Sequence, residues 1–388
     1  MRTQVTLDDG SVGVETIPEG ASKGEHEALY LPIEEAVRVV ADTLDKALKG
    51  MDSQDQRKVD ETMLRLDGTE NKCVLGGNSL ISVSLAVAKA AAVYKKMPLY
   101  KHLAFLYGNK DPIKLPTPLF NVINGGKHAH NGLSFQEFMV IPSRKVDFNQ
   151  ALEMGVDIYH QLKTDLINAG YDVDVGDEGG FAPNNLNPRI ALGLIKKSAG
   201  EKYKVGEEIF FGLDVAAESF WEGDHYHIKE ENQVFNNQEL SGYYLDLLKD
   251  YELILLEDPF YENDRNGWKM FTSQYKDKLM VVADDLVVTN TRLLKTAIEE
   301  KLATAVIVKP NQVGTLSETL DFIKNARKDG MSIIVSHRSG DTAEDTFIAD
   351  LCVGVGADFI KSGAPARGER VAKYNRLLEI YHSLNILR

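Results

Sequence analysis

Polar residues stand directly after a series of short apolar stretches in the second half of the chain. Ala305–Val308, for example, is followed by Lys309. The polar residues that end these stretches are Asp214, Glu257, Asp284, Lys309, His337 and Lys361. Short apolar runs are typical of buried parallel strands, and the steps from position 257 to 284, 309, 337 and 361 (27, 25, 28 and 24 residues) each suit one βα unit. We therefore expect these polar side chains to meet at the carboxyl ends of parallel strands, where α/β enzymes place their chemistry.

Three of these residues, Asp214, Glu257 and Asp284, are carboxylates on consecutive expected strands. Any one of them alone would be better explained as a helix cap or a loop residue. Three at matching strand ends, without a sulfur ligand or an obligatory histidine, form a set of oxygen ligands that suits a hard cation such as Mg2+. The spacing therefore favours a magnesium site at this rim.

Two lysines, Lys309 and Lys361, are expected on the same rim. Near a divalent cation they should lower one another's pKa, so that a neutral amine can act as a base. Glu178, in an acidic glycine-rich stretch, and Glu137 would offer carboxyl groups as proton donors from the opposite side. A base and an acid on opposite faces of a metal-held substrate indicate an elimination or a racemisation, and loss of water is favoured if the acid reaches a hydroxyl.

The stretch Ser336–Gly340 sets Arg338 among hydroxyl side chains and shortly before a glycine. At a turn from strand to helix, this combination is typical of phosphate binding. Together with the metal ligands and the lysines, it predicts a phosphorylated, anionic small molecule as the substrate.

The composition limits the possible partners and location. The net charge is −14 and no basic run is interleaved with aromatic residues, which argues against nucleic acid or an anionic membrane as the main partner. Cys73 and Cys352 lie far apart and form no metal or redox motif, which suits a reducing cytosol. We find no signal peptide and no apolar run near the roughly 20 residues needed to span a bilayer. We therefore expect a cytoplasmic protein without membrane insertion.

The first part of the chain, residues 1–112, is predicted to be an α+β capping domain. Residues 2–18 alternate as two strands around the turn Asp8–Gly10. Apolar residues then recur at helical spacing in three stretches, Ile33–Leu48, Val59–Leu66 and Leu80–Tyr94. The Pro-containing segment Asp111–Pro118 follows and makes a plausible domain boundary.

The second part, residues 113–388, is predicted to be an α/β domain, a (β/α)8 barrel of the TIM type. Before the βα units begin, two strands are expected, at Leu119–Gly126 and Ser134–Pro142, and a helix at Phe148–Ala169. A short strand at Asp172–Val175 should open into the acidic glycine loop, and a helix is expected at Leu316–Lys328.

With these motifs assembled, the sequence resembles the enolases (phosphopyruvate hydratases) over nearly its whole length. The motifs that carry the resemblance come in the family's order: Leu66–Asn71, Asn121–Gly126, Val175–Gly180, Glu257–Pro259, Ala283–Leu286, Lys309 with Asn311 and Gln312, Ser336–Gly340, and Lys361 through Asn375. The resemblance implies an α+β cap followed by a barrel with an irregular ββαα start. It also implies the reversible conversion of 2-phosphoglycerate to phosphoenolpyruvate in glycolysis, with two Mg2+ ions in each active site.

The resemblance also assigns roles to single residues. Asp214, Glu257 and Asp284 would hold the first magnesium and Ser22 would help to hold the second. It gives a catalytic part to Lys309 as base, to Glu178 assisted by Glu137 as acid, and to Lys361, His337 and His128. It gives substrate contacts to Gln136, Arg338, Ser339, Lys361 and His128, with Arg338 and Ser339 at the phosphate.

The chain departs from the family pattern at several places. Glu19 and Lys23 stand where serine and threonine are usual, on either side of Ser22. The family's first strand, with its Ser-Arg-Gly-Asn-Pro-Thr motif, and a segment between Leu29 and Pro32 have no counterpart. Glu19 and Lys23 leave open a related enzyme that acts on another phosphorylated 2-hydroxy acid. The resemblance leaves open a second alternative, a non-catalytic surface-binding or structural role. The resemblance further implies a homodimer or larger homo-oligomer, with secondary surface partners and a secondary cell-surface presence as further expectations.

Overall fold

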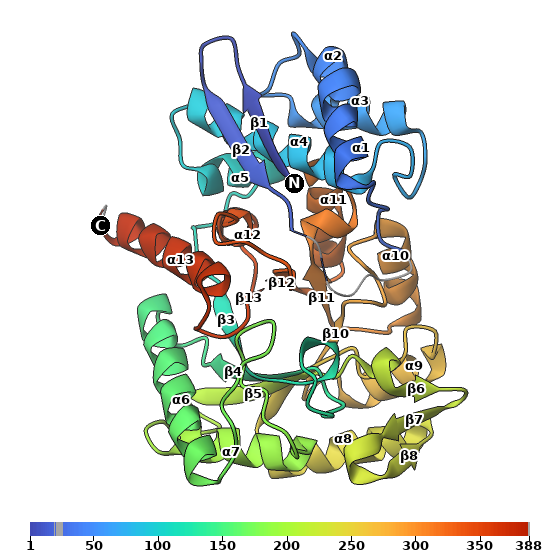
Figure 1. Cartoon of the computed structure of the whole chain (residues 1–388), viewed down its shortest axis with the longest axis vertical. Helices are drawn as coiled ribbons and strands as arrows, with labels where there is room; N and C mark the ends of the chain where they lie inside the picture. The colour runs from blue at the N-terminus through green and yellow to red at the C-terminus, as the bar shows by residue number, and fades with distance from the viewer. Residues whose placement is uncertain (19, 21–25, 387–388) are drawn as a thin grey trace.

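The computed structural model describes residues 1–18, 20 and 26–386. Figure 1 shows two parts: a strand hairpin and helices from the first part of the chain lie at the top, and the remaining elements form a barrel with surrounding helices below them. Ser22, Glu19 and Lys23 lie outside the described residues, so the expectations that concern them are not addressed by the structure.

The upper part begins with an antiparallel hairpin of β1 (Arg2–Thr6) and β2 (Val12–Thr16), as the sequence predicts. The turn is stabilised by Asp9, whose carboxylate accepts from the Ser11 amide at 2.9 Å, and by Gly10 at φ +87°. Helical segments follow: α1 (Ile33–Arg38), the π-helical η1 (Val39–Leu44), α2 (Asp45–Leu48), α3 (Gln56–Asp67), α4 (Gly77–Tyr94) and α5 (Leu99–Tyr107). The three expected helical stretches are thus confirmed, and α5 is an additional helix.

α4 forms the centre of the upper part. It packs against both strands of the hairpin and against α3 and α5. By length and composition α4 could cross a membrane, but 83% of its 18 residues are buried inside the protein. The helix is apolar because it lies in the core of the protein.

The lower part is a closed barrel of eight strands in the order β10-β11-β12-β13-β3-β4-β5-β9. The strands are β3 (Thr117–Asn124), β4 (Glu137–Pro142), β5 (Ile209–Asp214), β9 (Leu253–Glu257), β10 (Met280–Ala283), β11 (Ala305–Val308), β12 (Ser332–Ser336) and β13 (Phe359–Lys361). β4 pairs antiparallel with both β3 and β5, and the other neighbouring strands are parallel. The barrel predicted from the spacing of polar residues is confirmed.

The irregular start of the barrel is also present. After β4 come two successive helices, α6 (Phe148–Asn168) and α7 (Pro188–Gly200), before β5, which gives the ββαα order. The later helices are α8 (Asn237–Asp250), α9 (Arg265–Tyr275), α10 (Thr291–Glu300), α11 (Leu316–Lys328), α12 (Phe347–Val355) and α13 (Gly368–Ile386). The strand expected at Asp172–Val175 is wrong, because only Val175 forms an isolated bridge, to Phe181.

A small three-stranded sheet that the sequence analysis did not predict lies between β5 and α8. It consists of β6 (Trp221–Glu222), β7 (His225–Ile228) and β8 (Gln233–Phe235). It explains why 43 residues separate Asp214 from Glu257, which is more than one βα unit requires.

The barrel has an apolar interior and an apolar outer layer. Inward-facing residues form one fully packed cluster: Leu119, Met139, Ile141, Leu255, Val282, Ala305, Ile307, Ile334 and Phe359. A second, larger cluster joins the outer faces of the strands to the helices. Because the interior is filled, the polar residues that follow the strands are held at one rim and cannot fold back into the barrel.

Candidate active site

The predicted site residues that the structure describes gather at one rim of the barrel. β5 and β9 end with Asp214 and Glu257, which are in register, and Glu137 at the start of the antiparallel β4 lies opposite Asp214. A small pocket at this rim is lined by Glu27, His128, Gln136, Glu137, Glu178, Asp214, Ala216, Asp258, Asp284, Asp285, Lys309, Ser336, His337, Arg338, Ser339 and Lys361. The pocket volume is only about 30 Å³, because oppositely charged side chains fill it.

Lys361 is the centre of the acidic side of this pocket. Its Nζ donates to Oδ2 of Asp214 at 3.0 Å and to both carboxylate oxygens of Glu257 at 2.8 and 2.9 Å, and it lies 3.1 Å from Oε1 of Glu137. All four residues are buried. Although burial alone would lower the pKa of an ammonium group, these carboxylates raise the pKa of Lys361 well above its usual range. Burial and the neighbouring Asp214 raise the pKa of Glu257.

Lys309 forms the second ion pair, with Asp284, whose other oxygen accepts from Nε2 of Gln312 at 3.4 Å. Burial opposes the charge on Lys309, but Asp284 outweighs this effect and raises the lysine's pKa. Lys361 does lower the pKa of Lys309, as the sequence-based argument expects, but Asp284 outweighs it, so the expected net decrease is not met by the protein groups alone. Each lysine forms ion pairs with carboxylates that its position in the sequence does not predict.

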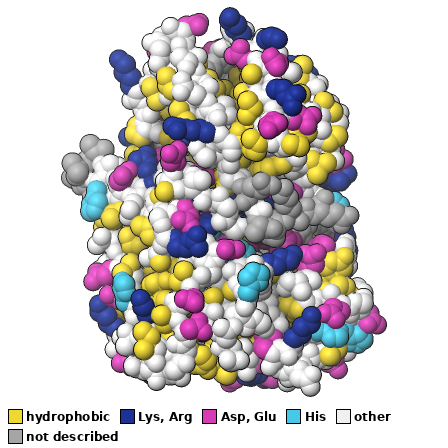
Figure 2. Space-filling view, in the orientation of Figure 1, with side chains coloured by type: hydrophobic (Ala, Val, Ile, Leu, Met, Phe, Trp, Pro, Cys, Tyr) yellow, Lys and Arg dark blue, Asp and Glu magenta, His cyan; other side chains and the backbone are white. Residues whose placement is uncertain are grey.

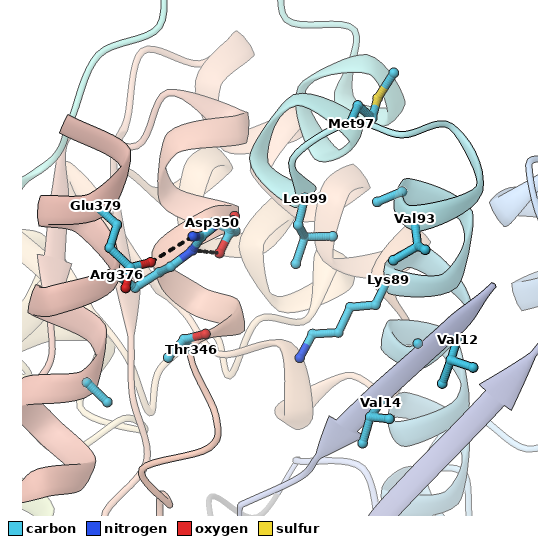
Figure 3. A pocket seen from close by; sticks show the side chains of 13 residues that line it. Val12, Val14, Lys89, Val93, Met97, Leu99, Thr346, Asp350, Arg376 and Glu379 are labelled. Atoms are coloured by element: carbon cyan, nitrogen blue, oxygen red, sulfur yellow. Dashed lines mark hydrogen bonds and ion pairs between the residues drawn. The ribbon is translucent and has the colours of Figure 1, made fainter. Parts of the chain in front are cut away.

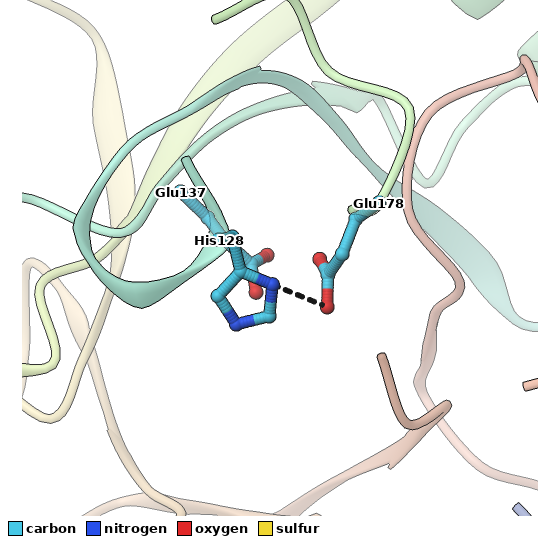
Figure 4. Close-up of side chains that lie close together, drawn as sticks. All are labelled: His128, Glu137 and Glu178. Atoms are coloured by element: carbon cyan, nitrogen blue, oxygen red, sulfur yellow. Dashed lines mark ion pairs between the residues drawn. The ribbon is translucent and has the colours of Figure 1, made fainter. Parts of the chain in front are cut away.

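Glu137 and Glu178 lie close to His128 in this pocket (Figure 4). One nitrogen of His128 and one oxygen from each glutamate all lie within 4.8 Å of one another. Burial, then the charge of Glu178, raises the pKa of Glu137 well above its usual range. Burial also opposes ionisation of Glu178, but His337 and His128 lower its pKa well below its usual range. The surroundings thus push the pKa values of the two carboxyl groups in opposite directions, upward for Glu137 and downward for Glu178.

Three polar side chains surround the Glu178 carboxylate. Nδ2 of Asn121, on β3, donates to Oε2 at 3.0 Å. Nε2 of His337 and Nδ1 of His128 lie 3.2 and 3.3 Å from Oε1. Burial, followed by the charge of Arg370, lowers the pKa of His337 to about 4, so this histidine is neutral at pH 7.

Arg338 also lines the pocket. Its Nη1 donates to Oε2 of Glu27 at 2.9 Å, and both side chains are buried. Although burial opposes its charge, Glu27 raises the pKa of Arg338. Ser339 also lines the pocket, as does Gln136, whose Nε2 donates to Oδ2 of Asp214 at 3.4 Å.

The donor atoms at the rim suit a hard cation. Asp214, Glu257 and Asp284 supply buried carboxylate oxygens from three neighbouring strands, and no cysteine lines the pocket. One oxygen each from Asp258, Asp284 and Asp285 also lie within 4.8 Å of one another. Asp258 accepts from the amides of Asp284 and Asp285 at 3.0 and 2.9 Å, so it orients the Asp284 segment. The predicted ligand set therefore fits a divalent metal.

A larger cleft elsewhere lacks this chemistry. It has a volume of about 510 Å³ and is formed by residues of β2, α4, α12 and α13, including Val14, Lys89 and Arg376 (Figure 3). Arg376 binds both oxygens of Asp350 at 2.8 Å, and Lys89 lies 3.0 Å from Glu15. The charged side chains of this cleft are in ion pairs, so the rim pocket is the better candidate.

Comparison with known proteins shows the family of this chain. The family model for the enolase C-terminal TIM barrel domain matches residues 112–386, and the family model for the enolase N-terminal domain matches residues 1–103. The enolase of Lactobacillus helveticus (strain DPC 4571) is 46% identical over 400 residues, which cover 99% of this chain and 91% of that protein. The chain belongs to the enolase family.

Membership of the enolase family makes the chain a lyase of the phosphopyruvate hydratase type, and it implies a small-molecule substrate and a divalent metal cofactor. The 400 aligned positions exceed the 388 residues of this chain, so the relative has internal residues that this chain lacks. That agrees with the expectation that a family segment is missing.

The sequence analysis missed several residues of the site, notably Glu27, Asn121 and Arg370. Asn121 lies in a motif quoted for the resemblance, so its family position was the available signal. Arg370 likewise lies within the quoted motif from Lys361 through Asn375. Glu27 lies far from the barrel strands in the sequence and reaches the pocket through its contact with Arg338.

Proposed function

We propose that this chain catalyses the reversible, Mg2+-dependent dehydration of 2-phosphoglycerate to phosphoenolpyruvate. The observation that supports this best is the opposition of base and acid across the barrel. Lys309 follows β11, and Glu137, which assists the proposed acid Glu178 and lies close to it, begins β4. These two strands are separated by three strands on either side in the eight-stranded order. A substrate between them can lose a proton from one face and a hydroxyl from the other.

In the proposed reaction Lys309 takes the proton from carbon 2, and the electrons of that C–H bond form the second bond between carbons 2 and 3. The C3–O bond breaks, and the leaving hydroxyl takes a proton from Glu178, which Glu137 assists, and departs as water. Arg338 and Ser339 hold the phosphate. The remaining pocket residues that would contact or orient the substrate are Gln136, His128, His337 and Lys361.

Asp214, Glu257 and Asp284 would hold the first Mg2+, and Ser22 is proposed to help to hold the second. When bound, Mg2+ supplies positive charge that stabilises the substrate carboxylate as carbon 2 loses its proton. Engagement of Asp284 by a cation would remove the main interaction that raises the pKa of Lys309. The amine would then be better suited to act as a base.

The test is ultraviolet absorbance when 2-phosphoglycerate is added to the purified protein with Mg2+ or with a chelator. A rise from the enol phosphate product is expected only with Mg2+, and it should be lost in Lys309→Met. Absence of a rise in protein shown to be folded would refute the proposal. The same assay with other phosphorylated 2-hydroxy acids tests the alternative substrate that Glu19 and Lys23 leave open.

Further proposals complete the description. We propose a division into a capping domain, 1–112, and a catalytic barrel, 113–388, and a homodimer or larger homo-oligomer in the cytoplasm. On the face in Figure 2, acidic and basic side chains are interspersed without a broad basic area, which supports a small-molecule ligand in preference to nucleic acid.

A further inference from the structure

Arg370, on α13, is a fully buried arginine to which none of the roles above is assigned. Its Nη1 donates to the carbonyl oxygen of Arg338 at 2.7 Å, and its Nη2 donates to that of Ser339 at 2.5 Å. Nη2 also donates to the carbonyl oxygen of Asp177, the residue before Glu178, at 3.2 Å. One side chain therefore joins the loop of the proposed acid to the turn of the proposed phosphate ligands.

The same guanidinium group determines the state of His337. Nη1 of Arg370 lies 2.7 Å from Nδ1 of His337. A guanidinium group has hydrogens to donate and no lone pair to accept with, so Nδ1 must be the acceptor. The neutral imidazole then carries its hydrogen on Nε2, the nitrogen that lies 3.2 Å from Oε1 of Glu178. The opposite tautomer would turn a lone pair toward the carboxylate.

The surroundings of Arg370 suit positioning better than packing. A buried arginine is costly unless its charge and donors are satisfied. The carboxylate of Glu369 is 3.9 Å from Nε, beyond hydrogen-bond distance, and the bonds of Arg370 given above go to three carbonyls and an imidazole. The planar guanidinium group donates hydrogen bonds to two loops at once, which a lysine or an apolar residue at this position could not do.

We propose that Arg370 is a positioning residue for the dehydration, which holds His337 with Nε2–H toward Glu178 and keeps the Arg338–Ser339 turn at the phosphate end of the pocket. The inference rests on the proposed function. The hydrogen bonds of Arg370 go to His337 and to the carbonyl oxygens of Arg338, Ser339 and Asp177, and not to the proposed proton-transfer groups, Lys309 and the Glu178 carboxylate.

The first test reads the histidine directly and needs no turnover. In protein labelled with 15N-histidine, long-range 1H–15N spectra report which ring nitrogen carries the hydrogen, and His337→Gln identifies the signals. We expect a single neutral Nε2–H tautomer at pH 7 without substrate, and a loss of that preference in Arg370→Met. An Nδ1–H tautomer or an imidazolium in the wild type would overturn the proposal, whether or not the protein dehydrates 2-phosphoglycerate.

The second test is kinetic and uses a matched control on the same helix. Arg376 also lies on α13 but binds Asp350 in the separate cleft (Figure 3), so Arg376→Met removes a partly buried arginine contact away from the site. Arg370→Met should lower kcat about 100-fold, the scale expected for displaced catalytic groups, and raise KM for 2-phosphoglycerate. Arg376→Met should lower thermal stability and leave both constants within about twofold.

Wild-type kcat and KM in folded Arg370→Met would overturn the proposal. If that variant does not fold, Arg370→Lys decides the question, because it keeps the charge but cannot reach His337 and both carbonyls from one plane. It should retain part of the activity, with kcat reduced about tenfold, and an unchanged kcat with an unchanged His337 tautomer would refute the role. If the wild type shows no turnover, the proposed function fails, while the tautomer measurement still tests Arg370.

Discussion

At the residue scale, the charge balance of the pocket depends most on Lys361. Its ammonium group lies within about 3 Å of three buried carboxylates, those of Glu137, Asp214 and Glu257. Removing it leaves these acids close together without a compensating charge. Breaking a buried ion pair in this way typically costs about 3–5 kcal/mol, whereas a solvent-exposed pair contributes about 0–1 kcal/mol.

Lys361→Met is therefore expected to lower the free energy of unfolding by about 3–5 kcal/mol. The matched control is Lys196→Met, because Lys196 pairs with Glu252 at a half-exposed position and should cost less than about 1 kcal/mol. Urea unfolding of both variants measures the difference. Equal losses would show that the rim carboxylates do not need Lys361.

Lys309→Ala separates proton abstraction from metal binding. Turnover of 2-phosphoglycerate should fall by about 10²–10⁴-fold, because the proposed general base is removed. Mg2+ affinity should be unchanged or higher, since Asp284 loses its competing partner and the other carboxylates lie on other strands. Isothermal titration with Mg2+ and the absorbance assay measure the two effects. Retained turnover would contradict the role of Lys309, and lost Mg2+ binding would contradict the separation.

At the element scale, the amino end of α11 is capped by the upper part of the molecule. The Leu316 amide donates to Oγ of Ser84, and the Ser317 amide donates to Oδ2 of Asp60, each at 2.9 Å. Asp60 also accepts from Oγ of Ser84 at 2.7 Å. α3 and α4 thereby hold the helix that follows the Lys309 segment, so the position of the base depends on the contact between the two parts.

The same cap predicts a dependence of stability on pH. Burial raises the pKa of Asp60 from 3.8 to about 6. The folded state then binds a proton at Asp60 more tightly than the unfolded state does. The stabilisation that this proton gives the folded state is therefore present below about pH 4 and is lost as the pH rises to about 6. The loss is about 3 kcal/mol. Asp60→Asn should remove this part of the pH dependence in urea unfolding between pH 4 and 7. If the difference in unfolding free energy between Asp60→Asn and the wild type stays constant across that range, this prediction is wrong.

The elements themselves could largely be predicted from the sequence. The bounds of α11 agree with the expected Leu316–Lys328, because apolar periodicity and the caps point to the same ends. β6–β8 were missed because strands of two to four residues are too short to show a period. The overlong interval between Asp214 and Glu257 was their signal. α5 was missed although Pro98, just before it, is typical of a helix start.

At the scale of the whole molecule, strand-end spacing was sufficient to predict which residues meet at the rim, because a closed barrel leaves them no other place. It could not predict how they pair. Glu27 reaches Arg338 across 311 positions of sequence, and Lys361 reaches Asp214 across 147. A third pairing, of Lys309 with Asp284, reversed the expected direction of the Lys309 pKa shift. Local patterns thus determined the location of the site, and tertiary contacts determined its charge states.

Binding of a divalent metal should stabilise the whole fold, because the ligands come from separate strands and converge only when the barrel closes. A ligand that binds the folded state alone adds about 2.7 kcal/mol at 100 times its Kd. We therefore expect Mg2+ to raise the Tm of the wild type relative to a chelator, and to raise that of Glu257→Gln much less. Glu15→Gln, a buried acid beside Lys89 outside the pocket, is the control and should keep the full shift. Equal shifts in wild type and Glu257→Gln would place the stabilising cation away from the rim, because Glu257 joins the other two carboxylates only there.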